Sequence, residues 1–128
     1  MALQTPFAAI RTPLYAIVRF VAGILFAFHG AQKLFGWFGG QRVELASQLG
    51  LAGLIELLGG LAIALGFLTT LAAAGSALEM IAAYLIAHAP RGLLPIQNQG
   101  ELALLYLLIF VLILIEGGGR WSVDSLLC

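Results

Sequence analysis

Residues 49–68 read LGLAGLIELLGGLAIALGFL, twenty residues in which Glu56 is the one charged side chain. A helix needs about 20 predominantly apolar residues to span the hydrocarbon core of a bilayer. The chain has three further stretches of the same character, at about 14–35, 71–88 and 101–116. Together the four stretches predict an all-α fold, an integral membrane four-helix up-and-down bundle.

The composition supports this interpretation and assigns the whole chain, 1–128, to a single transmembrane domain. The chain is 62% hydrophobic and only 9% charged, whereas a soluble domain carries about 25% charged residues. A soluble fold of this size could not hide so much apolar surface, but lipid solvates apolar side chains directly.

The segments between the apolar stretches are short and contain residues that end helices. Residues 36–48 are polar and rich in glycine, Thr69 and Thr70 form a tight link, residues 89–100 contain two prolines, and three glycines begin at Gly117. Short links favour antiparallel neighbours and therefore a compact bundle, with both termini on one side of the membrane. Residues 1–13 lack the features of a cleavable signal and are expected to form an interfacial lead-in.

Several classes of function are disfavoured. Six basic and six acidic residues give a formal net charge of zero, and without a basic run we expect no nucleic-acid partner. A single cysteine, Cys128, excludes an internal disulfide, and no Cys/His cluster suggests zinc or another metal. The fingerprints of nucleotide-binding loops are absent.

Three ionisable residues are predicted to form a buried polar core in the middle of the bundle: Arg19, Glu56 and Glu79. Arg19 would neutralise Glu56 or Glu79 and fix the register of the helices. The carboxylate left without a strong counter-ion would titrate and take up or release a proton near a redox centre. Both roles can coexist. Glycines beside Glu56, at Gly53 and Gly60, would allow another backbone to approach closely.

A second polar layer is expected near the membrane face of the two longer loops. Its ligand-binding candidates are His29, Lys33, His88 and Glu101. In the structural interpretation Glu101 pairs with Lys33 or Arg91. In the functional interpretation these groups line a pocket at the level of the lipid head-groups. Glu79 and His88 are nine residues apart, so they can face the same partner only if the third helix is bent or wholly interior.

His29 and His88 are also candidate ligands of a cofactor. Phe26 and Phe28 could provide flat apolar space for a haem or chlorin beside His29, but a lone histidine near a helix end is more often an interfacial hydrogen-bonding group. Haem or chlorin is therefore ranked below a quinone as the bound cofactor.

Five segments in order resemble motifs of the DoxX family, over residues 15 to 124. They are HGAQKLFG at 29–36, GLIE at 53–56 with Gly59-Gly60, Glu79-Met80 with HAPRG at 88–92, PIQNQGE at 95–101, and WSVD at 121–124. The chain departs from the family pattern at Gln99, where glycine is frequent, and at Arg120, where proline is frequent.

The resemblance implies a four-helix membrane protein linked to quinone-dependent oxidation of reduced sulfur in some members, and to membrane oxidoreductase complexes in others. The leading hypothesis is a redox-linked membrane subunit supporting electron or proton transfer with partner proteins. A quinone carbonyl would accept hydrogen bonds from His29 or Lys33, and its ring would lie against Phe26 or Phe35.

Two alternatives remain open at this point: a structural accessory subunit of a larger respiratory or photosynthetic complex, and a small-solute or proton pathway. The expected partners are the lipid bilayer and other membrane or redox proteins, in a homo- or hetero-oligomer. The expected location is the bacterial inner (cytoplasmic) membrane. No catalytic residue and no enzymatic activity are assigned.

Overall fold

The computed structural model describes residues 5–127, so the start of the predicted lead-in (1–4) and Cys128 lie outside the described residues. The elements follow in the order η1 (Ala8–Ile10), α1 (Arg11–Phe35), α2 (Gln48–Leu65), α3 (Thr69–Ala83), η2 (Tyr84–His88), η3 (Ala89–Arg91), α4 (Pro95–Asn98), α5 (Glu101–Glu116) and α6 (Val123–Leu127). No strand occurs between residues 5 and 127, and the all-α prediction is confirmed.

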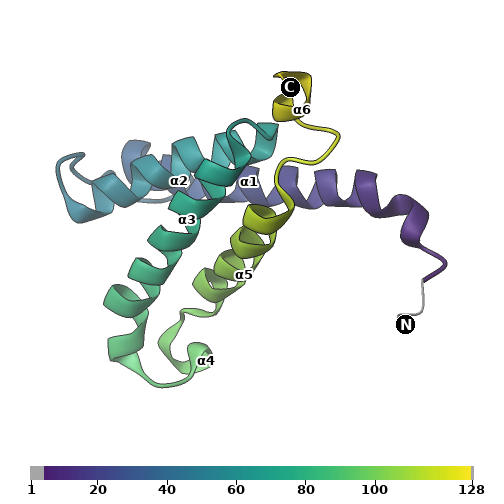
Figure 1. Ribbon diagram of the computed structural model, residues 1–128. Helices are drawn as coiled ribbons and strands as arrows, with labels where there is room; N and C mark the ends of the chain where they lie inside the picture. The colour runs from purple at the N-terminus through teal and green to yellow at the C-terminus, as the bar shows by residue number, and fades with distance from the viewer. Residues whose placement is uncertain (1–4, 128) are drawn as a thin grey trace.

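The long helices form two hairpins that diverge. Helices α1 and α2 lie side by side, as do α3 and α5, and the two pairs run in clearly different directions (Figure 1). Helices α2 and α3 are joined by a tight turn at Gly66–Leu68 and α1 has little contact with α5. The expected compact bundle is therefore replaced by an open arrangement with a hollow between two arms.

Small residues determine how closely α1 and α2 pack. A Cβ atom added to Gly23 would collide with the backbone of Gly60 and Ala64, and one added to Gly30 would collide with that of Gly53 and Leu57. Because these glycines lack side chains, the two helices touch backbone to backbone, which is common where membrane helices pack. The predicted close approach beside Glu56 is confirmed.

The second hairpin packs through a mixture of alanine and aromatic side chains. Ala73, Ala77 and Met80 on α3 meet Ala103, Tyr106 and Phe110 on α5, and Phe26 of α1 joins them. The Phe26 ring lies 4.7 Å from Phe110 and 5.2 Å from Tyr106, between ring centroids. This aromatic cluster connects the two arms next to the hollow.

Three helices are long and apolar enough to cross a membrane: Ala8–Phe35, Gln48–Leu65 and Thr69–Arg91. Large apolar side chains are exposed along their outer faces, for example Ile17, Leu58 and Leu71, as expected where lipid replaces water. Helix α5 has 16 residues, or about 24 Å of rise, which is shorter than the roughly 30 Å hydrocarbon core. The fourth crossing stays a prediction.

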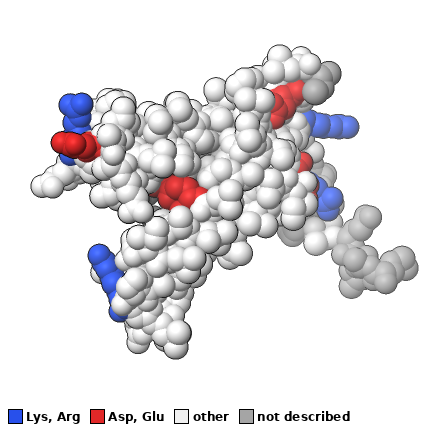
Figure 2. Space-filling model, turned by 60° about the vertical axis from the view of Figure 1, so that its left-hand side comes forward, with Lys and Arg blue, Asp and Glu red and all other residues white. Residues whose placement is uncertain are grey.

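The C-terminal segment returns to the start of the chain and closes one end of the molecule. The Tyr15 hydroxyl donates to the Gly117 carbonyl at 2.6 Å, so the beginning of α1 and the end of α5 lie at the same end. The two longer loops lie at the tips of the two arms, well apart from each other, and the hollow lies between the arms (Figures 1 and 2).

Candidate functional site

The hollow between the hairpins contains a cavity of about 760 Å³, within the size range of small-molecule sites. Residues from α1, α2, α3, η2 and α5 line it, and most of the lining is apolar. The polar side chains in the lining are His29, Lys33, Gln48, Glu56, Glu79, His88, Gln99 and Tyr106. The space-filling view shows acidic atoms at the base of the hollow, surrounded by uncharged surface (Figure 2).

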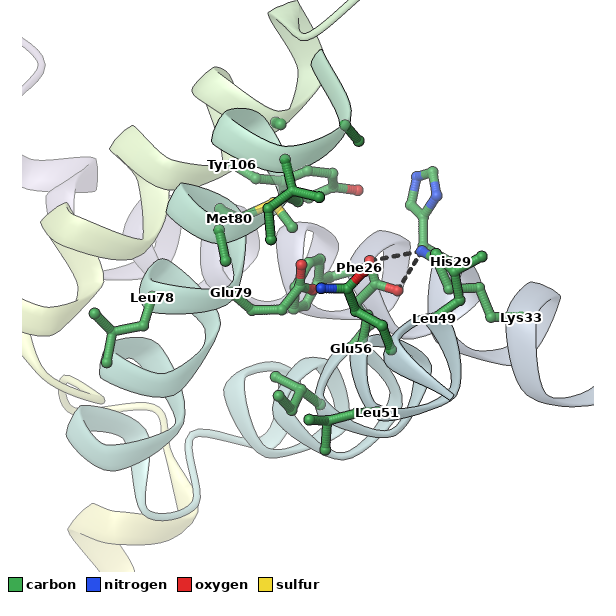
Figure 3. A pocket seen from close by; sticks show the side chains of 18 of the residues that line it. Phe26, His29, Lys33, Leu49, Leu51, Glu56, Leu78, Glu79, Met80 and Tyr106 are labelled. Carbon is green, nitrogen blue, oxygen red and sulfur yellow. Dashed lines mark hydrogen bonds and ion pairs between the residues drawn. The ribbon is translucent and has the colours of Figure 1, made fainter. Parts of the chain in front are cut away.

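An ion pair between the two helices of the first hairpin stands at the base of the cavity. The Lys33 ammonium donates to both oxygens of Glu56, at 2.8 Å and 2.5 Å (Figure 3). The Glu56 side chain is 5% exposed and that of Lys33 is 27% exposed. Because Gly53 has no side chain, the Lys33 Cβ packs directly over α2, and the ammonium reaches Glu56 one turn further along.

Glu79 approaches the same pair from the other hairpin. Its carboxyl group points toward that of Glu56 (Figure 3). The Glu79 Oε1 atom is buried and has no hydrogen-bond partner among the described residues. Two carboxyl groups and one ammonium therefore meet where the two arms diverge, and Lys33–Glu56 is the only ion pair found within residues 5–127.

A change of helix type brings His88 into the cavity together with Glu79. Residues 84–88 form a π-helical turn at the end of α3, and π turns are wider than α turns. Glu79 and His88 are nine residues apart, and a regular α-helix would turn them to different faces. The wider π turn changes this angle, and both side chains line the cavity. The His88 Nδ1 atom lies 3.1 Å from the Asn98 carbonyl oxygen.

Two polar groups at or beside the cavity are not among the candidates that the sequence predicts, Asn98 beside it and Tyr106 in its lining. Asn98 is fully buried and holds the loop before α5: its amide donates to the Tyr84 hydroxyl and the Gly92 carbonyl at 3.1 Å, and its oxygen accepts from Gly100 N at 2.8 Å. Tyr106 stands 5.9 Å from the His29 ring, edge to face. A tyrosine in the middle of an apolar helix was a usable signal, because its hydroxyl needs a partner.

Glu101 is not part of the polar cluster in the cavity, so the prediction that it is a ligand-binding residue paired with Lys33 or Arg91 is wrong. The side chain is exposed, does not line the cavity, and forms no ion pair with Lys33 or Arg91. Lys33 is already engaged by Glu56. Arg91 is exposed, and its hydrogen bond is to the Gln99 side chain at 3.5 Å.

Arg19 also differs from the prediction, because it pairs with neither Glu56 nor Glu79. Its guanidinium donates to the carbonyls of Ile63 and Ala64 at 3.2 Å and to that of Trp121 at 2.6 Å. Arg19 is 2% exposed. The first two acceptors belong to the last turn of α2, where carbonyls lack helical partners and a cation is favoured. Arg19 thus joins α1, α2 and the C-terminal segment at the end away from the cavity.

Asp124 completes this junction by capping α3. Its carboxylate accepts from Leu68 N at 2.8 Å, Thr69 N at 2.9 Å and Thr69 Oγ1 at 2.6 Å. Leu68 itself has φ 48°, in the left-handed region, so the tight turn between the hairpins depends on this side chain. The hydrogen bonds from Thr69 lower the pKa of Asp124 below its ordinary value of 3.8.

We expect Asp124→Ala to lower the free energy of unfolding by about 1–2 kcal/mol at neutral pH, the usual cost of losing a helix cap. Because the folded-state pKa is lowered, the stabilisation is complete above 3.8 and disappears as the pH falls through the lowered value. Thermal unfolding in detergent at several pH values should therefore show the difference from the parent shrinking in acid. The exposed Glu44→Ala serves as the control, and an equal or growing difference in acid would contradict the capping role.

The residues gathered here match the segments that carried the resemblance in the sequence. The sequence model of the DoxX family matches residues 14–89, more than half of the chain. The chain belongs to the DoxX family. The matched region contains Lys33, Glu56 and Glu79, and therefore the polar base of the cavity.

Other comparisons are consistent with this membership. The DoxX chain is 37% identical to an uncharacterized protein of Haemophilus influenzae over 117 residues, which covers 86% of this chain and 87% of the relative. No solved structure matches the chain. Family membership and three apolar helices of sufficient length together indicate a membrane protein.

Proposed function

We propose that this DoxX protein binds the ring of a quinone in the cavity between its hairpins and acts as a membrane subunit that supports electron or proton transfer with partner proteins. The observation that carries the proposal is a cluster of polar groups, Lys33, Glu56 and Glu79, at the base of an otherwise apolar cavity. A quinone ring is flat and apolar, and its carbonyl oxygens accept hydrogen bonds. Such a ligand needs an apolar site with a few placed donors.

The arrangement of the aromatic side chains supports a flat ligand. Phe26, Tyr106 and Met80 form one wall of the cavity (Figure 3). His29 and Lys33 lie on the adjacent helix, where a ring carbonyl could accept from them. The expected site thus keeps His29, Lys33 and His88 of the predicted ligand-binding candidates.

Electrons must come from another protein in this proposal. The sequence has a single cysteine, and no group of three or more metal-ligating side chains occurs within residues 5–127. The family resemblance makes a protein that oxidises reduced sulfur compounds the first partner to test.

A substitution that fills the cavity provides the test. Gly75 lines the cavity, and a Cβ atom there would meet nothing within 4 Å. We expect Gly75→Leu to fold normally and to weaken binding of decylubiquinone about tenfold or more, equivalent to about 1.4 kcal/mol. Binding is measured by equilibrium dialysis of the purified protein in nanodiscs, alongside analysis of quinones extracted with the parent protein.

The control places a large apolar side chain outside the cavity. Leu108→Phe on the exposed face of α5 should leave the affinity unchanged. A parent protein that retains no quinone and binds none, yet co-purifies in fixed ratio with a large membrane complex, would replace this proposal with the structural accessory role.

A further inference from the structure

The charges at the base of the cavity do not balance if every group is ionised. Lys33 supplies one positive charge, and Glu56 and Glu79 would supply two negative charges. The other titratable groups on the cavity wall are His29 on α1, Tyr106 on α5 and His88 in η2, farther toward the mouth. Among the described residues none of these three forms an ion pair with Glu79.

The geometry also leaves an unsatisfied atom. Among the described residues Glu79 Oε1 is buried without a hydrogen-bond partner, although the Glu56 carboxyl group faces it (Figure 3). Two ionised carboxylates can only accept hydrogen bonds, so they cannot satisfy each other. A single proton between them supplies the missing donor and removes the excess charge, as in other sites where two carboxyl groups share one proton.

We propose that Glu56, anchored by Lys33, and Glu79 share one exchangeable proton, and that the protonated carboxyl group turns from its partner to donate this hydrogen bond to a ligand carbonyl when a ligand enters the cavity. The ligand part rests on the proposed quinone site. The site therefore selects a neutral hydrogen-bond acceptor, and its affinity is coupled to the proton. Only binding is involved: the proton stays on the pair and no bond to the ligand forms.

The two hairpins contribute one carboxyl group each, Glu56 from α2 and Glu79 from α3. The shared proton therefore also joins the arms at the point where they begin to diverge (Figure 3). When it leaves, two carboxylates face each other across the cavity base, and the ligand loses a donor while meeting an added negative charge.

The proton is tested first in the protein without ligand, by infrared spectroscopy of the full chain in nanodiscs near neutral pH. The parent should show the carbonyl stretch of a protonated carboxylic acid, which shifts in D₂O because the proton exchanges. Glu79→Gln should remove this band, and Glu101→Gln, at an exposed carboxylate, should leave it unchanged. A parent protein without the band overturns the proposal.

The coupling is tested by decylubiquinone binding across pH. In the parent the affinity should fall about tenfold for each pH unit above the midpoint at which the infrared band disappears. Glu79→Gln keeps a donor but cannot ionise, so its binding should be independent of pH. Equal pH dependence in both proteins overturns the coupling.

The two proposals fail in different ways. A protein that shows the infrared band but binds no quinone at any pH refutes the quinone site and leaves the shared proton intact. A protein that binds quinone with no band and no pH dependence refutes the shared proton and leaves the quinone site intact. If Glu79→Gln does not accumulate, the D₂O shift and the pH profile of the parent protein still decide both questions.

Discussion

Arg19→Leu is expected to lower the free energy of unfolding in detergent by about 3 kcal/mol or more, so that little of the variant accumulates in membranes. The guanidinium donates to three carbonyl oxygens, those of Ile63, Ala64 and Trp121. Hydrogen bonds from a charged group contribute about 1.5–3 kcal/mol each, and acceptors left buried without partners add a penalty. Leucine removes every one of these donors, so the carbonyls of Ala64 and Trp121 lose this partner and that of Ile63 keeps only the hydrogen bond from Gly66 N.

The measurement is thermal unfolding of the purified protein, with membrane yield as a second readout. Arg42→Leu is the matched control, because Arg42 is exposed in the loop between α1 and α2 and should cost little. Arg19→Lys should have a free energy of unfolding between those of the parent and Arg19→Leu, because one ammonium cannot reach three acceptors arranged around a planar guanidinium. An Arg19→Leu protein as stable as the parent would contradict the junction described here.

The prediction that Arg19 pairs with Glu56 or Glu79 is wrong because it places each residue by its position within its own helix and not by the register between paired helices. The loop between α1 and α2 has its midpoint near Gln41 and Arg42, so an antiparallel hairpin pairs residues symmetrically about that point. Arg19 then lies level with Ala64, eight residues or about 12 Å beyond Glu56. Lys33 lies on the other side of Glu56 and is nearer. This register was available in the sequence and predicts the pair that forms.

Other features of the site depend on packing that no local pattern reveals. The nine-residue spacing of Glu79 and His88 predicts that both can face one cavity only if the helix is bent or wholly interior. Nothing in the sequence of residues 84–88 marks them as a π turn. The sequence places Asn98 in a loop, and its burial follows from its hydrogen bonds to Tyr84 and Gly92 across that loop. Glu101 starts α5, but its direction depends on that same loop.

The apolar stretches predict the helices because the length of an apolar segment can be compared with the thickness of the bilayer without knowing which helices pack against it. The packing of the helices is harder to predict, because short links require neighbouring helices to be antiparallel but do not determine the angle between two hairpins. Here the α2–α3 turn at Gly66 and Leu68 is held by Asp124 from the C-terminal segment, a contact between residues more than fifty positions apart. The two arms diverge on either side of this turn, so the geometry of the cavity depends on a contact that no local sequence pattern reveals.

Gly60→Ala is expected to have a large effect for the addition of a single methyl group. A Cβ atom there would lie 2.5 Å from the Gly23 carbonyl oxygen and 2.5 Å from Ala27 N. Both neighbours are backbone atoms of α1 that cannot rotate away, so the helices must separate. Because that separation would also pull Lys33 from Glu56, we expect a loss above about 3 kcal/mol, beyond the usual cost of overpacking.

Gly75→Ala is the matched control for this substitution, since a Cβ at Gly75 meets nothing within 4 Å. It should be neutral or should stabilise α3 by about 0.5–1 kcal/mol, as alanine favours a helix over glycine. Thermal unfolding and membrane yield of the two variants give the comparison. If Gly60→Ala proved as stable as Gly75→Ala, α1 and α2 could not be in backbone contact, and the geometry that presents Lys33 and Glu56 to the cavity would have to be different.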